Sequence, residues 1–267
     1  VFYDPFVGGS GTQATGTGSY TLAVEVVGGI SNGPVILGDR DAGLSVGVNA
    51  SGVIGIPAGS TPPGTDDQPV GIRLGSNEFL LDDTSATESL WGATFNGFGF
   101  RNSDVRADLQ VSITQQSDPT NRRVTIAGLF RGLDVRRTLS YGVNDRFIAV
   151  DVTLTNTTQL NMFDVAWVEA FNPQTGLNRQ TTVARTLNNV DNATGRLVTA
   201  SFTDNDFPGG LTIGLASGPA PSGARVVAAV EDLDSIRDPF QVLDDQTPDP
   251  DTSPADVGDG SRVCLRA

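Results

Sequence analysis

Hydrophobic and polar residues alternate with a period of two along much of this chain. In residues 124–130, Val124 and Ile126 alternate with Thr125 and Ala127, and residues 147–155 repeat the same period. This alternation predicts half-buried strands, and no segment with helical periodicity is comparably strong. The pattern favours antiparallel sheets, which commonly bury one face and expose the other.

Turn residues separate the predicted strands. Asp118-Pro119-Thr120-Asn121 and Gly142-Val143-Asn144-Asp145 supply turn chemistry around the central pair, because Asn and Asp accept left-handed backbone angles. A helical spacing over 230–243 is interrupted by Pro239 and predicts one short turn. We expect strands at 20–27, 43–48, 52–56, 71–74, 78–81, 93–100, 107–115, 123–129, 133–141, 146–156, 163–171, 196–202, 211–216, 224–230 and 262–267.

Composition supports an all-β fold. The chain has 267 residues, of which 38% are hydrophobic, and its 32 Gly and 15 Pro suit many short strands joined by turns. We expect a large antiparallel β-sandwich over residues 37–267, a linker at 28–36, and the terminal hairpin of a smaller β domain at 1–27. Because the chain opens without Met and residues 262–267 end in mid-alternation, we expect it to be part of a longer protein.

The charge and the missing residue types exclude several functions. There are 31 acidic and 17 basic residues, a net charge of −14, so we expect no nucleic acid partner. No histidine is present, which excludes Ser-His-Asp catalysis and His-ligated zinc within the chain. No apolar run approaches the roughly 20 residues of a membrane helix, so we expect no membrane insertion. The one cysteine, Cys264, has no disulfide partner in the chain and is expected as a strand residue.

Residues 3–26 carry Asp4-Pro5, a glycine-rich turn at Gly8-Gly9-Ser10-Gly11 and the strand Gly18-Ser19-Tyr20-Thr21-Leu22. In that order they resemble the closing hairpin of bacterial pre-peptidase C-terminal domains. Those domains are small secreted β-sandwiches attached to extracellular peptidases and adhesins. The resemblance implies an exported, multidomain parent protein and no catalysis in this segment.

Residues 70–267 carry Leu154-Thr155-Asn156-Thr157 followed by Val165-Ala166-Trp167. This stretch resembles the large β-sandwich modules of bacterial surface proteins and calcium-dependent repeat proteins, including adhesins. The segment 171–176 departs from that pattern, with Asn172 where the modules have Asp. The resemblance implies a β-sandwich fold, and it gives less support to calcium binding.

Two tryptophans are candidates for ligand binding. Trp167 lies in an alternating strand, so it is either a core residue or an exposed platform that stacks on sugar rings. Trp91 carries the same two alternatives. An exposed role for either would indicate a glycan ligand.

Calcium is the cofactor that the acidic loops suit best, because it takes oxygen ligands from carboxylates and carbonyls. Asp204, Asn205 and Asp206 form the best candidate site, with solvated acidic loops as the alternative. None of the acidic loops has the EF-hand spacing or a glycine-aspartate nonapeptide repeat.

Glu169 raises the alternative of an enzyme, because it follows Trp167 at a position where sandwich-fold sugar enzymes place a catalytic residue, and such an enzyme needs two facing carboxylates. We expect instead a non-catalytic structural or adhesive module of a secreted or cell-surface bacterial protein that binds a glycan or a surface protein. The rival hypotheses are a carbohydrate-active hydrolase or lyase and an accessory domain of an extracellular peptidase.

Overall fold

The computed structural model describes residues 30–31, 33–39, 42–56, 70–75, 77–80, 89–103, 106–171, 187–190, 196–202, 211–218, 227–230 and 263–266. Every regular element in these ranges is a β-strand, and every strand pair is antiparallel. The all-β fold expected from the alternation is confirmed. The ranges include no helix of the length and apolarity that crossing a membrane requires.

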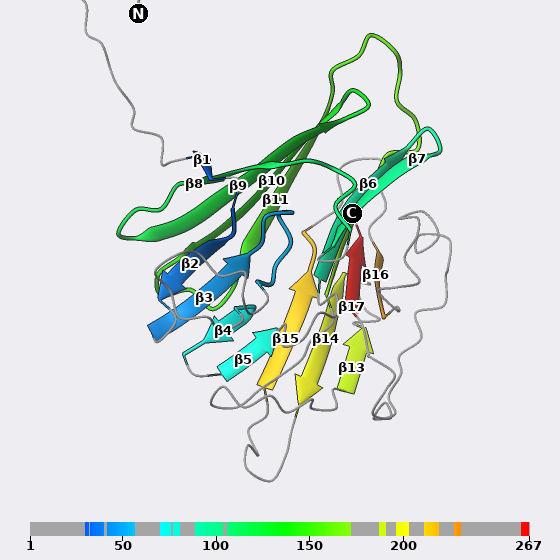
Figure 1. Cartoon of the computed structure of the whole chain (residues 1–267). Helices are drawn as coiled ribbons and strands as arrows, with labels where there is room; N and C mark the ends of the chain where they lie inside the picture. Colours follow the sequence, from blue (N-terminus) through cyan, green and yellow to red (C-terminus); the bar gives the residue numbers. More distant parts are fainter. Residues whose placement is uncertain are drawn as a thin grey trace, which may run out of the picture.

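The strands form four sheets (Figure 1). Sheet I has the order β1 (Ile30–Ser31), β8 (Ser112–Gln115), β9 (Asn121–Phe130), β10 (Leu133–Gly142) and β11 (Ala149–Asn156). Sheet II has the order β16 (Val227–Val230), β17 (Val263–Arg266), β12 (Ala166–Phe171), β6 (Ser89–Phe95) and β7 (Phe98–Ser103). Sheet III contains β2 (Val35–Asp39), β3 (Ala42–Val48), β4 (Ile72–Leu74) and β5 (Asn77–Leu80). Sheet IV contains β13 (Leu187–Val190), β14 (Leu197–Phe202) and β15 (Leu211–Ala216).

One hydrophobic core joins sheets I, II and III. In Figure 1 the long green strands β9 and β10 cross the upper part of the view, with the blue and cyan strands of sheet III below them. The core takes side chains from each of these sheets, for example Ile126 from β9, Trp91 from β6 and Val46 from β3. Burial of this apolar surface is the main term that stabilises the packing of the sheets.

The alternation in the centre of the chain has the predicted consequence. Val124 and Ile126 of β9 are fully buried, whereas Leu129 on the opposite face is exposed. The core-facing residues of β9 pair with core-facing residues of β10: Val124 pairs with Leu139, and Gly128 pairs with Val135. One face of sheet I therefore lies on the core and the other faces solvent.

Several predicted boundaries are wrong. Residues 93–100 form two strands, because Asn96 and Gly97 have positive φ angles of 50° and 73° and make a two-residue hairpin turn. Asn-Gly between apolar residues is a strong signal for this turn. Residues 52–56 contain only isolated bridges, at Ile54 and Ile56, and only 112–115 of the expected strand 107–115 is a strand.

The linker expected at 28–36 is also corrected where the structure describes it. Ile30 and Ser31 pair with β8, and Val35 begins β2 with its side chain in the core. Burial of Val35 explains why this segment is part of the fold. The terminal hairpin expected at 1–27 and residues 231–243 of the predicted short turn lie outside the described residues.

Candidate functional site

An ion pair in the interior connects sheets I and II. Arg137 of β10 is 1% exposed, and Glu169 of β12 has a side chain that is 15% exposed. The Arg137 Nε donates to Glu169 Oε1 at 2.7 Å, and its Nη2 donates to Oε2 at 2.9 Å. The two parallel hydrogen bonds are the strong, planar geometry that arginine forms with a carboxylate.

A third hydrogen bond of Arg137 connects the ion pair to the segment that follows β3 of sheet III. The Arg137 Nη1 donates to the carbonyl oxygen of Gly52 at 2.9 Å. Residues 49–56 follow β3 directly, and Val48 bridges to Ile54. One guanidinium therefore holds three separate stretches of the chain together.

The two tryptophans flank this ion pair. The Trp91 and Trp167 rings stack with their centroids 5.3 Å apart and their planes at 27°. Trp167 Nε1 donates to Glu169 Oε1 at 3.2 Å, and the Arg137 guanidinium carbon lies 6.0 Å from the Trp91 ring centroid. Trp91 also pairs directly across the strands with Glu169.

Local sequence explains this arrangement. Trp167 and Glu169 are two residues apart on β12, so their side chains leave the same face of the strand. Every residue of β6 is buried, and a side chain at Gly92 would collide with the carbonyl oxygen of Phe100 on β7. Glycine therefore allows β6 and β7 to approach beside Trp91.

Burial decides between the two roles expected for the tryptophans. Trp91 is 1% exposed and Trp167 is 5% exposed, so neither indole has a face open to a sugar ring. The prediction of an exposed binding platform at Trp91 and Trp167 is corrected, because the rings pack on each other in the core. The core alternative for Trp167 agrees with its burial.

The chemistry open to Glu169 is equally restricted. Both carboxylate oxygens accept hydrogen bonds from Arg137, and one also accepts from Trp167. Glycoside hydrolysis needs a pair of carboxylates facing each other across a cleft. In the part of the chain that the structure describes, no group of three or more His, Cys, Asp or Glu side chains is placed so that it could hold a metal ion.

Arg137 was not among the residues singled out from the sequence, although a signal for it exists. Leu133, Val135, Leu139 and Tyr141 are the buried hydrophobic residues of β10, and Arg137 has their parity. An arginine on the apolar face of a strand requires a buried acceptor, since an unpaired interior charge is very costly. The alternation thus implied a partner, which the fold supplies from β12.

The proposed calcium residues Asp204, Asn205 and Asp206 lie outside the described residues. Cys264 lies in β17, where it pairs with Ala170 of β12 and Ala229 of β16. Its expected place in a strand is confirmed.

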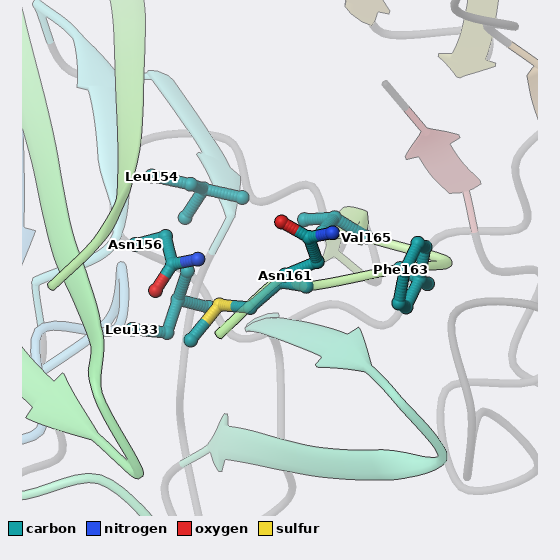
Figure 2. A pocket seen from close by; sticks show the side chains of 7 residues that line it. Leu133, Leu154, Asn156, Asn161, Phe163 and Val165 are labelled. Carbon is teal, nitrogen blue, oxygen red and sulfur yellow. The ribbon is translucent and has the colours of Figure 1, made fainter. Parts of the chain in front are cut away.

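A pocket of about 350 Å³ opens where the chain passes from sheet I to sheet II (Figure 2). Leu133, Leu154 and Asn156 line it from the ends of β10 and β11, and Phe163 and Val165 line it from the connecting loop 157–165. Phe163 is 62% exposed, and Leu160 and Val165 of the same loop are also exposed. Apolar side chains and the amides of Asn156 and Asn161 therefore surround an opening that solvent can enter.

Hydrogen bonds hold this loop to two hairpin turns. Thr157 donates from both N and Oγ1 to the carbonyl oxygen of Gly132, each at 2.8 Å. Phe163 N donates to Asn96 Oδ1 at 2.6 Å, and Asn96 N donates to the Phe163 carbonyl oxygen at 2.9 Å. The loop that lines the pocket is thus held to the β9–β10 turn at one end and to the β6–β7 turn at the other.

Comparison of the chain with protein-family models, with curated proteins and with solved structures gives no match in any of the three.

Proposed function

We propose that this chain is a non-catalytic structural or adhesive module of a multidomain secreted or cell-surface bacterial protein, built as a large antiparallel β-sandwich. The observation that carries the proposal is the ion pair of Arg137 and Glu169. The acidic residue that best suited a catalytic role has both oxygens bound by an arginine of the opposite sheet. Its role is to join sheets.

The net charge of the chain bears on which partners it can bind. The net charge of −14, with no lysine, keeps a protein soluble and repels polyanions such as nucleic acids. The partner in this proposal is a glycan or another surface protein. The exposed apolar residues around the pocket, Phe163 among them, are the kind of surface through which such modules bind.

Calcium is the proposed cofactor, and Asp204, Asn205 and Asp206 are its proposed ligands. Two carboxylates and an amide in three consecutive residues supply the oxygen atoms that calcium prefers. Stabilisation by a bound ion suits a module that works outside the cell.

One experiment separates the adhesive module from a carbohydrate-active enzyme. The purified protein is incubated with a panel of immobilised and soluble polysaccharides and surface proteins, and both retention and newly formed reducing ends or unsaturated sugars are measured. Retention without cleavage supports the proposal. Cleavage of any polysaccharide by the wild-type protein overturns it.

A further inference from the structure

Among the described strands, β11 forms an open edge of sheet I. In the described part of the chain it pairs with β10 alone, over eight residues from Ala149 to Asn156. An open edge presents unpaired N–H and C=O groups that can bind another strand. This property makes β11 a surface on which an extended peptide can add.

The register identifies which backbone groups face outward. The hydrogen bond from Thr157 N to Gly132 O extends the β10–β11 register by one pair. In an antiparallel pair, hydrogen-bonded positions alternate with positions that point away. The odd residues 149–155 therefore bond to β10, and Val150, Val152 and Leu154 direct their N–H and C=O groups to the open edge.

The same residues border the pocket. The side chains of Val150, Val152 and Leu154 face the core, and Leu154 and Asn156 line the pocket. In Figure 2, Leu154 and Asn156 lie on one side of the opening, with Asn161, Phe163 and Val165 on the other. A peptide residue paired with Leu154 would share its face of the sheet and point its side chain into this space.

An acidic residue lies on the opposite face of the same edge. Asp151 is exposed and pairs across the strands with Thr138, so none of the described basic residues lies directly opposite it. An added strand would bring a side chain next to Asp151 at cross-strand distance, where an opposite charge is favourable. The net charge of −14 disfavours a second copy of this chain as the added strand.

We propose that the β11 edge and its pocket bind an extended, basic segment of a partner protein by β-strand addition. The segment runs antiparallel to β11, places an apolar side chain in the pocket opposite Leu154, and places Arg or Lys three residues later opposite Asp151. Backbone hydrogen bonds supply affinity and the pocket supplies selectivity, as in other strand-addition complexes. This inference rests on the proposed function, because it specifies the protein partner of an adhesive module.

A displayed library of random twelve-residue peptides tests the proposal. We expect the wild-type protein to enrich peptides with an apolar residue followed, three positions later, by Arg or Lys. The strongest peptide is then synthesised with a fluorescent label for titration. Absence of enrichment, or enrichment without this spacing, overturns the proposal.

Val152→Pro tests the backbone contact. Its N–H faces the open edge, so proline removes a donor that β10 does not use, and edge positions are where sheets tolerate proline. We expect at least tenfold weaker binding of the labelled peptide with a thermal melt close to that of the wild type. Unchanged affinity in this variant overturns the proposal.

Asp151→Arg tests the charge contact, with Asp134→Asn on the same exposed face of β10 as the matched control. We expect Asp151→Arg to lose the basic peptide and to gain a peptide in which Glu replaces its Arg or Lys, while the control binds as the wild type does. This gain of function cannot come from unfolding. If the charge swap has no effect, the proposal fails, whereas the adhesive function fails only if the polysaccharide assay shows cleavage.

Discussion

Arg137 and Glu169 belong to different sheets, yet two hydrogen bonds of 2.7 and 2.9 Å join their side chains in the interior. Residues 32 positions apart in the chain are thereby fixed face to face. Taking both charges out of water is costly, and the two-point geometry with the added bonds to Gly52 and Trp167 offsets that cost.

Removal of one partner leaves the other charge buried and unpaired. We therefore expect Glu169→Gln to lower the free energy of unfolding by about 3–5 kcal/mol, measured by urea denaturation. The double variant Arg137→Met with Glu169→Leu should recover much of that loss, because no charge then remains in the core.

The surface pair of Arg106 and Asp108 is the matched control, since Arg106 is largely exposed. We expect Arg106→Gln to change stability by about 1 kcal/mol or less. A similarly small effect of Glu169→Gln would mean that the interior pair does not hold the sheets together.

The turn between β6 and β7 depends on its glycine. Gly97 has a φ of 73°, and a Cβ there would meet no atom within 4 Å, so only backbone strain opposes a side chain. We expect Gly97→Ala to cost about 1–2 kcal/mol in thermal or urea unfolding. Gly99→Ala lies in β7 without a positive φ and serves as the control, with a much smaller effect. Equal effects of the two substitutions would contradict this account.

Asp118 organises the turn before β9. Its carboxylate accepts hydrogen bonds of 2.7 Å from Thr120 Oγ1, Thr120 N and Asn121 N, and these bonds lower the pKa of Asp118 to about 2. The usual pKa of an Asp in an unfolded chain is about 3.9. The stabilisation is therefore complete above about pH 4 and is lost as the pH falls through about 2.

Titration of the Asp118 carboxyl signal by NMR should give this low pKa. In parallel, the stability of the wild type should fall more steeply between pH 4 and 2 than that of Asp118→Asn, which has no charge to lose. A measured pKa near 4 would show that the turn does not favour the ionised form.

Calcium should raise the melting temperature if the proposed site at Asp204–Asp206 binds it. A ligand that binds only the folded state adds about 2.7 kcal/mol of stability at a hundredfold excess over its Kd. We expect a melt in millimolar calcium to shift upward relative to a chelated sample, and the shift to vanish in Asp204→Asn with Asp206→Asn. An unchanged melt in the wild type would contradict calcium binding.

The sequence alone was sufficient to predict strands where hydrophobic and polar residues alternate regularly. The period of two in β9, β10 and β11 predicted strands close to those observed, and the burial of Ile126 and exposure of Leu129 follow the parity of that pattern. Such predictions succeed because the face of a strand is determined by residue parity. Strand β15 was predicted with its observed bounds for the same reason.

Prediction from the sequence was weaker for features that depend on contacts between residues far apart in the chain. Alternation alone does not identify Glu169 as the acceptor for Arg137, because that pairing depends on how two sheets pack. The pocket could not be predicted either, since it forms where loop 157–165 meets two distant turns. The β6–β7 break was readable from Asn96-Gly97 and was missed because the apolar run on both sides suggested one strand.

Strand β17 has a consequence for the order of events during synthesis. It lies between β16 and β12, and Val168 of β12 pairs with Arg266, almost one hundred residues later in the chain. Until residues 263–266 have left the ribosome, β12 can pair only with β6 among the described strands, and β16 has no described strand to pair with. Both pairings of β17 thus form only after those residues emerge from the ribosome, and until then the strand edges that β17 covers are exposed to aggregation.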